Sequence, residues 1–247
     1  MPRAFQDRLA HVLASAGLHV VVPDLLGHGR SDRPADPMAY SVTAFAEQVV
    51  GLLDHLGATQ AVVGGTGIGA NVALEVAVEA GARVRGLLLD GPVLEDALTT
   101  EVGTLTPLLY LARFAPLGVR AAGWAARPVP RRLLPGQARV GVDMLEQQPA
   151  PLAALVHGVL FGRLAPSLLE RQAITTPALV IARPGDPFRR VSDAEALAEQ
   201  LPTASLERVE VPWRRDRAPE QLDMAVSRFV LDAARPKGIR RSRRGGA

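Results

Sequence analysis

The stretch "AVVGGTGIGANVALEVA", residues 61–77, decides the fold of this 247-residue chain. It begins as a short apolar run, passes through glycines and a threonine, and continues with the spacing of an amphipathic helix. The pattern predicts a buried strand, a tight turn and a helix. An α/β enzyme can carry its nucleophile at the tip of such a turn, yet the stretch contains no Ser, Cys or Asp.

The overall composition is that of a globular protein with a sizeable core. Apolar residues make up 48% of the chain, which suits one large α/β domain or a core with an insert. There is no uncharged apolar run of about 18 residues, and Arg3, Asp7 and Arg8 interrupt any secretory leader, so we expect no membrane span and a cytoplasmic protein. The absence of cysteine excludes disulfides, thiolate metal sites and cysteine nucleophiles.

The excess of basic charge is concentrated at the C-terminus. Residues 235–247 hold six of the 28 basic residues and no acidic one, which leaves the rest of the chain mildly acidic. A basic segment with few apolar residues cannot pack a core, so we predict a disordered tail over 235–247. Weak contact of this tail with polyanions is the alternative, and we expect no specific nucleic-acid partner.

Apolar strand patterns alternate with helical patterns along most of the chain, which predicts a mostly parallel sheet with helices on both faces. The predicted strands are 18–24, 61–64, 84–90, 177–182 and 205–211, and the predicted core helices are 3–16, 42–57, 68–81, 192–201 and 218–234. Between residues 93 and 174, helical segments are broken by prolines and no strand pattern is present. We therefore predict a core of residues 1–92 and 175–234 and a helical cap over 93–174.

The order of these segments resembles the α/β-hydrolase family, in the capped form of esterases and haloalkane dehalogenases. Besides residues 61–77, the resemblance lies in "VVVPDLLGHGRSDRP" (20–34), "LLLDGP" (87–92) and "PALVIARPGDP" (177–187). Each segment alone is a weak signal, but four in this order and at this spacing are specific. The resemblance implies an α/β-hydrolase fold with a capped pocket.

The family's nucleophile turn needs small residues two positions before and two positions after the nucleophile, because strand and helix cross closely there. A nucleophile at Thr66 would require a small residue at 68, where Ile68 stands. A nucleophile position at 67 places Gly65 and Gly69 at the two flanks. The resemblance therefore assigns the nucleophile position to Gly67, which has no side chain, and the oxyanion-binding N–H to Ile68.

The other members of the family's catalytic triad are incomplete. The resemblance assigns the acid to Asp186, although a lone Asp on a turn after a strand more often has a capping or turn role. The five histidines are at positions 11, 19, 28, 55 and 157, so none follows the cap. Asp216 or Arg217 occupies the place of the family's histidine, and neither titrates near neutral pH to move a proton.

Other candidate groups fit structural roles at least as well. His28 is expected to brace its turn. In the cap, Trp124 and His157 are candidates for contacting a ligand, as are Tyr110, Phe114 and Phe161, but for each of them we favour packing in the core. No residues have metal-ligand spacing, and "GGTGIG" (64–69) lacks the acidic partner of a dinucleotide loop, so we expect neither metal nor cofactor.

The beginning of the chain also departs from the family. Three family strands precede the helix predicted here at 3–16, and the third would lie between the strands predicted at 18–24 and 61–64. We interpret this as a start codon placed too late. Without that strand, backbone groups on two inner strands lack partners, so we expect self-association through the exposed sheet.

Two functions of different classes follow from these residues. The first is a protein without serine-hydrolase activity that keeps a capped pocket for a small apolar ligand. The second is a hydrolase of the same fold that acts on a small apolar ester-like substrate through other groups, with Asp186, Asp216, Thr66 or side chains of the cap as candidates. We favour the first, because losing the nucleophile and the histidine removes most of the chemistry.

Overall fold

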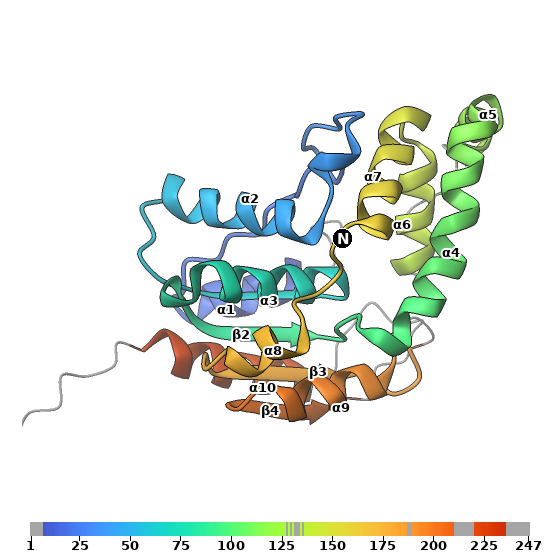
Figure 1. The fold of residues 1–247 in the computed structure, drawn as a ribbon. Coiled ribbons are helices and arrows are strands. Elements are labelled where there is room, and N and C mark those ends of the chain that lie inside the picture. The colour runs from blue at the N-terminus through green and yellow to red at the C-terminus, as the bar shows by residue number, and fades with distance from the viewer. Residues whose placement is uncertain are drawn as a thin grey trace, which may run out of the picture.

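The computed structural model of the protein describes residues 7–126, 128, 130, 134, 136–186, 189–209 and 220–235. At its centre is a four-stranded parallel sheet in the order β1-β2-β3-β4 (Figure 1). The strands are β1 Ala61–Thr66, β2 Val84–Asp90, β3 Ala178–Ala182 and β4 Ala204–Arg208. The register pairs Thr66 with Asp90 and Asp90 with Ile181, so the carboxyl ends of three strands meet at one edge of the sheet.

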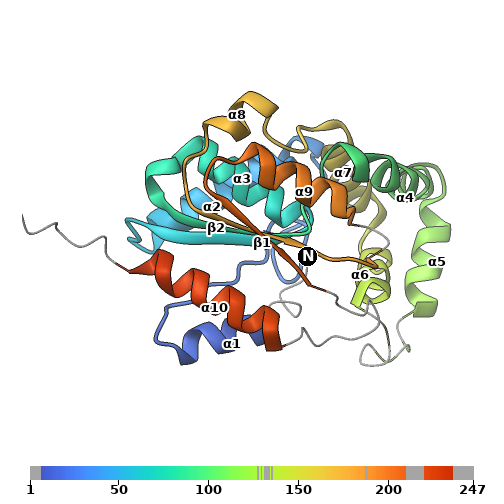
Figure 2. The ribbon, with the colours of Figure 1, turned by 90° about the horizontal axis from the view of Figure 1, so that it is seen from below.

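Helices cover both faces of the sheet (Figure 2). One face carries α2 (Val42–His55), α3 (Ile68–Ala80) and α9 (Val191–Gln200), and the other carries α1 (Asp7–Ser15) and α10 (Glu220–Ala234). Strand β3 is buried throughout and sends alternate residues to the two sides, which is the pattern expected of a parallel strand covered twice. The predicted fold class is therefore confirmed.

An insert made of helices lies between β2 and β3. It contains α4 (Glu95–Phe114), α5 (Pro116–Ala126), α6 (Gly136–Leu145), α7 (Pro149–Phe161) and α8 (Leu168–Ala173), and its described residues contain no strand. A small core of its own, built on Ala112, Val119, Leu152 and Val156, holds α4, α5 and α7 together. Gly158 of α7 lies so close to Tyr40 that an added Cβ would be 2.1 Å from the Tyr40 carbonyl oxygen, which seats the cap against the loop before α2.

The predicted strand at 18–24 is wrong. These residues alternate between more and less exposed positions, and Leu18 and Val20 pack with the apolar cluster beneath α10, but they form no ladder with a described strand. Apolar alternation predicts which side of a segment is buried, whereas a strand also needs a neighbour for its hydrogen bonds. Strand β1 has only β2 as a partner among the described residues, so its outer edge is unpaired there.

The other predicted elements agree with the structure to within a few residues. The strand predicted at 205–211 is found at 204–208, and residues 210–219 lie outside the described part of the chain. The same holds for residues 236–247, so the predicted disordered tail is not tested beyond Arg235. Among the described residues no single helix is long and apolar enough to cross a membrane, although α4 and α5 meet that criterion as a pair bent by 110°.

Candidate functional site

The turn between β1 and α3 has its tip at Gly67. This residue has φ 60° and ψ −125° and serves as the N-cap of α3. Its N–H donates to the Asp90 carbonyl oxygen at 2.9 Å, and its own carbonyl accepts from the Ala70 N–H at 2.9 Å. All described residues with positive φ are glycines, and Thr66 is not among them. The strained position therefore falls at 67 and not at 66.

The flanking glycines show how tightly this turn is built. A Cβ added to Gly65 would lie 2.2 Å from the Gly69 carbonyl oxygen, which is far inside any normal contact. A Cβ added to Gly69 would meet nothing within 4 Å. The need for a small residue is therefore one-sided here: it applies at 65, before the tip, and not at 69.

Glycine satisfies the backbone of this turn and contributes no reacting atom. Its φ costs nothing because it has no Cβ, whereas any other residue there would pay a strain of about 1–3 kcal/mol. Ile68 begins α3, so its N–H belongs to the first turn, where helical N–H groups have no acceptor within the helix. The oxyanion-binding role of this N–H stays a prediction.

The nearest hydroxyl, that of Thr66, is held by a neighbouring strand. Thr66 Oγ1 donates to Asp90 Oδ2 at 3.1 Å. The same carboxylate accepts two hydrogen bonds from Arg183, one from Nε to Oδ1 at 2.6 Å and one from Nη2 to Oδ2. Asp90 is 7% exposed, so this bidentate pair is largely withdrawn from water.

The predicted acid lies on the turn after β3 and is also paired. Asp186 Oδ2 is 2.7 Å from Arg189 Nη1, and both side chains are about one-tenth exposed. Burial lowers the pKa of Arg183, but the negative charges of Asp90 and Asp186 outweigh it and raise that pKa above its usual value. The acidic side chains at the carboxyl edge of the sheet are thus each paired with an arginine.

The residues predicted at the place of the family's histidine, Asp216 and Arg217, lie outside the described residues.

The histidines do not gather at this edge. His28 packs against the edge of Phe45, and its Nδ1 is 3.0 Å from the Leu26 carbonyl oxygen, so it braces its turn. Burial, with a contribution from Arg33, lowers the pKa of His28 to about 4, which keeps the ring neutral at physiological pH. The other four histidines, at 11, 19, 55 and 157, are exposed.

The candidate ligand-contacting residues of the cap are also exposed. His157 stacks on Phe161, with 4.7 Å between ring centroids, on the outer side of α7. Trp124 is 72% exposed and lines a hollow of about 340 Å³ between α5 and the end of α6. No residue of the nucleophile turn lines this hollow. Packing of the cap aromatics in a core is therefore wrong: Tyr110, Phe114 and Phe161 are exposed like Trp124.

Sequence reasoning missed a buried amide that joins the cap to the core. Asn71, in the first turns of α3, is fully buried, and its Nδ2 donates to the Val93 carbonyl at 2.6 Å and to the Leu164 carbonyl at 2.9 Å. Its Oδ1 accepts from the Val93 N–H at 3.2 Å. One side chain therefore holds the chain both at the start of the cap and after α7, just before α8.

A second buried residue fixes the first helix of the cap. Asp193, in the first turn of α9, accepts from the N–H groups of Leu94 and Ala97 through Oδ2 and from that of Asp96 through Oδ1, at 2.8–3.0 Å. These are the unpaired N–H groups that begin α4. An Asp at the start of a helix usually predicts a cap for that helix, so nothing in the sequence indicated that it caps another.

Groups of side chains able to hold a metal ion are absent from the described residues. Their polar clusters pair Arg with Asp or Glu, as at Asp90 and Arg183, and offer no open set of oxygen or nitrogen ligands. The expectation of no metal and no cofactor therefore stays a prediction of the sequence.

Comparison with known proteins supports the architecture. The family model described as "alpha/beta hydrolase fold" matches residues 3–119. A 2-hydroxymuconate semialdehyde hydrolase from Pseudomonas putida is 43% identical over 74 residues, which are 30% of this chain and 26% of that protein. Epoxide hydrolase A from Mycobacterium tuberculosis is 48% identical over 50 residues, or 20% of this chain and 16% of that protein. The matches thus span about a quarter or less of these relatives.

Solved structures resemble this one over most of their length. The meta-cleavage product hydrolase from Pseudomonas fluorescens superimposes with a TM-score of 0.66 and 20% identity, covering 92% of this chain and 84% of that one. The enol-lactonase from Burkholderia xenovorans gives 0.59 and 20%, covering 85% and 78%. At this identity the likeness concerns the fold. The parallel sheet, the glycine turn and these matches together place the chain among the proteins of the alpha/beta hydrolase fold.

Proposed function

We propose that this chain is an alpha/beta-hydrolase-fold protein without serine-type hydrolytic activity, which uses its capped core to bind a small apolar ligand. The observation that carries the proposal is the backbone of Gly67. The turn keeps the positive φ that presents a nucleophile, but the residue there has only hydrogen to present. Such a turn preserves the architecture of the site without its chemistry.

A hydrolase that uses other groups is the competing function, and Thr66 is its best nucleophile. Its hydroxyl would have to lose a proton to a base, and its hydrogen-bond partner is Asp90. That carboxylate already accepts two hydrogen bonds from Arg183, so its oxygens are engaged in a structural ion pair. An occupied carboxylate is poorly suited to take a proton in the reaction.

Asp186 supports the same conclusion. In a triad this acid orients a histidine, whereas here its partner is Arg189, a group that stays protonated and cannot shuttle a proton. The relatives with shared segments are named for hydrolysis of a semialdehyde and of epoxides, which indicates the kind of small molecule to test as a ligand. We propose binding of this class without turnover.

The test is hydrolysis of a panel of activated esters and epoxides by the purified chain, beside the variants Thr66→Val, Thr66→Ser and Asp186→Asn. We expect all four proteins to match a control protein of similar size. Turnover that Thr66→Val abolishes and Thr66→Ser retains would instead establish Thr66 as a nucleophile. Turnover that Asp186→Asn reduces about tenfold or more would establish an unusual catalytic set, because a merely structural pair would not change kcat in this way.

A further inference from the structure

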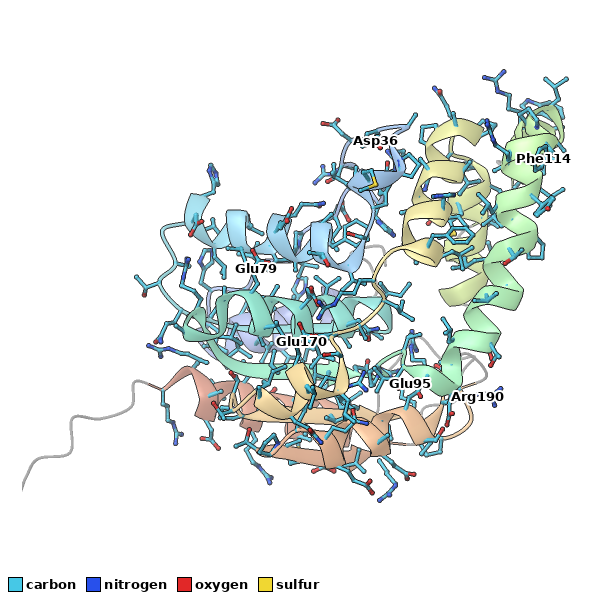
Figure 3. The ribbon with its side chains drawn as sticks, in the orientation of Figure 1. Asp36, Glu79, Glu95, Phe114, Glu170 and Arg190 are labelled. Carbon is cyan, nitrogen blue, oxygen red and sulfur yellow. The ribbon has the colours of Figure 1, made fainter. Side chains whose placement is uncertain are left out.

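An apolar surface is exposed on the outer corner of the cap. Tyr110 and Phe114 near the end of α4 are 62% and 73% exposed, and Leu117 and Trp124 of α5 are 76% and 72% exposed. Figure 3 shows Phe114 at the outer end of α4, pointing away from the sheet. We call these four residues the cap corner. Large side chains this exposed, grouped on two consecutive helices, indicate a surface that is covered in use.

The cap corner is not a poorly packed part of the cap's own core. The opposite sides of the same helices, at Ala112 and Val119, are buried with α7. The rings of Tyr110 and Phe114 lie together, with 5.2 Å between their centroids. The two helices therefore pack one face within the cap and expose another, apolar face.

The charge around the cap corner is mixed but mostly basic, since Glu146 and Arg120 line the same hollow as Trp124. Arg113 and Arg120 are exposed beside the apolar side chains. In sequence, residues 102–142 contain six arginines and no acidic residue, whereas the rest of the chain up to residue 234 contains 16 basic and 25 acidic residues. The whole cap, residues 93–174, holds eight basic and six acidic residues, so its excess of basic charge lies in the 102–142 stretch that carries the cap corner. This stretch suits a partner that is both apolar and negatively charged.

We propose that the cap corner docks on an anionic lipid surface. Tyr and Trp side chains favour the boundary between lipid headgroups and acyl chains, and arginines beside them pair with lipid phosphates while their stems stay in the apolar layer. Leu117 and Phe114 would enter the acyl region. This proposal is independent of the function proposed above, because it involves neither the turn at Gly67 nor any group near it.

Two other partners fit the same surface less well. A second copy of the chain would place the same patch against itself in a symmetric contact, where Arg113 and Arg120 would outnumber Glu146, the acidic side chain that lines the hollow beside Trp124. Nucleic acid would satisfy the arginines through its phosphates, but a duplex offers no apolar layer for Phe114 and Leu117. A lipid surface satisfies both properties.

The experiment uses the full chain with Trp213→Phe, which leaves Trp124 as the single tryptophan. Its fluorescence is followed while vesicles of phosphatidylserine and phosphatidylcholine in equal parts, or of phosphatidylcholine alone, are added. We expect a blue shift of the emission and quenching by brominated lipid with the anionic vesicles, both weakened by salt. Phe114→Ser with Leu117→Ser should weaken vesicle binding about tenfold or more.

Leu169→Ser is the matched control, because Leu169 is 77% exposed on α8 and lies outside the cap corner. It should bind vesicles as the parent does. Vesicle binding without a change in Trp124 emission would overturn the proposal, since basic residues elsewhere would then carry the binding. A blue shift that grows with protein concentration in the absence of lipid would also overturn it and assign the surface to a second copy.

Discussion

The Thr66 hydroxyl donates a hydrogen bond to the carboxylate of Asp90, with 3.1 Å between Oγ1 and Oδ2, at the point where β1 and β2 end side by side. The two residues are register partners in the parallel ladder, so the bond ties the last residue of one strand to that of the next. Together with Arg183 it fills the space beside the nucleophile turn with a paired network. The carboxyl edge of the sheet, where enzymes of open α/β folds place their chemistry, is here occupied by internal contacts.

The two glycines that flank the turn should respond differently to the same substitution. Gly65→Ala puts a Cβ into the Gly69 carbonyl and should lower the free energy of unfolding by roughly 2 kcal/mol or more. Gly69→Ala has open space and a helical position, so it should be neutral or stabilise by up to about 1 kcal/mol. Urea unfolding of both variants measures the difference, and equal losses would contradict the one-sided packing of this turn.

Restoring a serine at the vacant position should not restore hydrolysis. Gly67→Ser introduces a side chain at positive φ and should cost about 1–3 kcal/mol of stability, while its hydroxyl lacks a positioned base. Adding Asp216→His supplies an imidazole at the position that the sequence resemblance assigns to the family's histidine, so measurable esterase activity is expected only in the double variant. Arg217→His serves as the alternative position. Activity in the Gly67→Ser variant alone would mean that a base already lies within reach.

The start of the cap should depend on Asp193. Asp193→Ala removes the acceptor for three N–H groups that begin α4 and should lower stability by about 2–4 kcal/mol. Hydrogen exchange should accelerate at Leu94, Asp96 and Ala97 before it does in β3. Glu195→Ala, which breaks an exposed ion pair of the same helix, should cost at most about 0.5 kcal/mol and leave these amides protected.

His28 should make the protein sensitive to mild acid. Its pKa is about 4 in the folded protein against 6.5 for the unfolded chain, so the unfolded state binds the proton more readily. The contribution of neutral His28 to the free energy of unfolding is therefore fully present above pH 6.5. It is lost as the pH falls toward 4, and the loss is roughly 1–3 kcal/mol. His28→Phe should remove this part of the pH dependence, whereas His157→Gln, at an exposed site, should retain it. Urea midpoints measured from pH 7 to pH 4 give the comparison.

The sequence predicted the parts of this structure that depend on local pattern. The turn tip at position 67 followed from the family resemblance and from the glycines at 65, 67 and 69. The structure confirms the positive φ at Gly67 and the close packing at Gly65, whereas it leaves room for a side chain at Gly69. The apolar runs of β2 and β3 predicted two-sided burial. Apart from the family resemblance, these conclusions need only neighbours within a few positions of the chain.

What the sequence could not predict depends on distant partners. Residues 18–24 have the pattern of a strand, but pairing is a property of two segments and the second is not beside them. The bonds of Asn71 and Asp193 connect residues that are 22 to 99 positions apart, and neither residue type in its local setting indicates that partner. The exposure of Trp124 depends in the same way on how the cap helices pack.

The clamp at Asn71 has a consequence for how this protein can change. Because the carbonyls of Val93 and Leu164 accept hydrogen bonds from the same nitrogen, the part of the cap from α4 to α7 begins and ends within a few ångström of one point. A segment with such neighbouring ends can be lengthened, shortened or exchanged without pulling on the sheet, since the cost of closing a longer loop grows only slowly with its length. The segment from α4 to α7 is thus exchangeable, and a graft joined at residues 93 and 164 could give the same core and α8 a different surface.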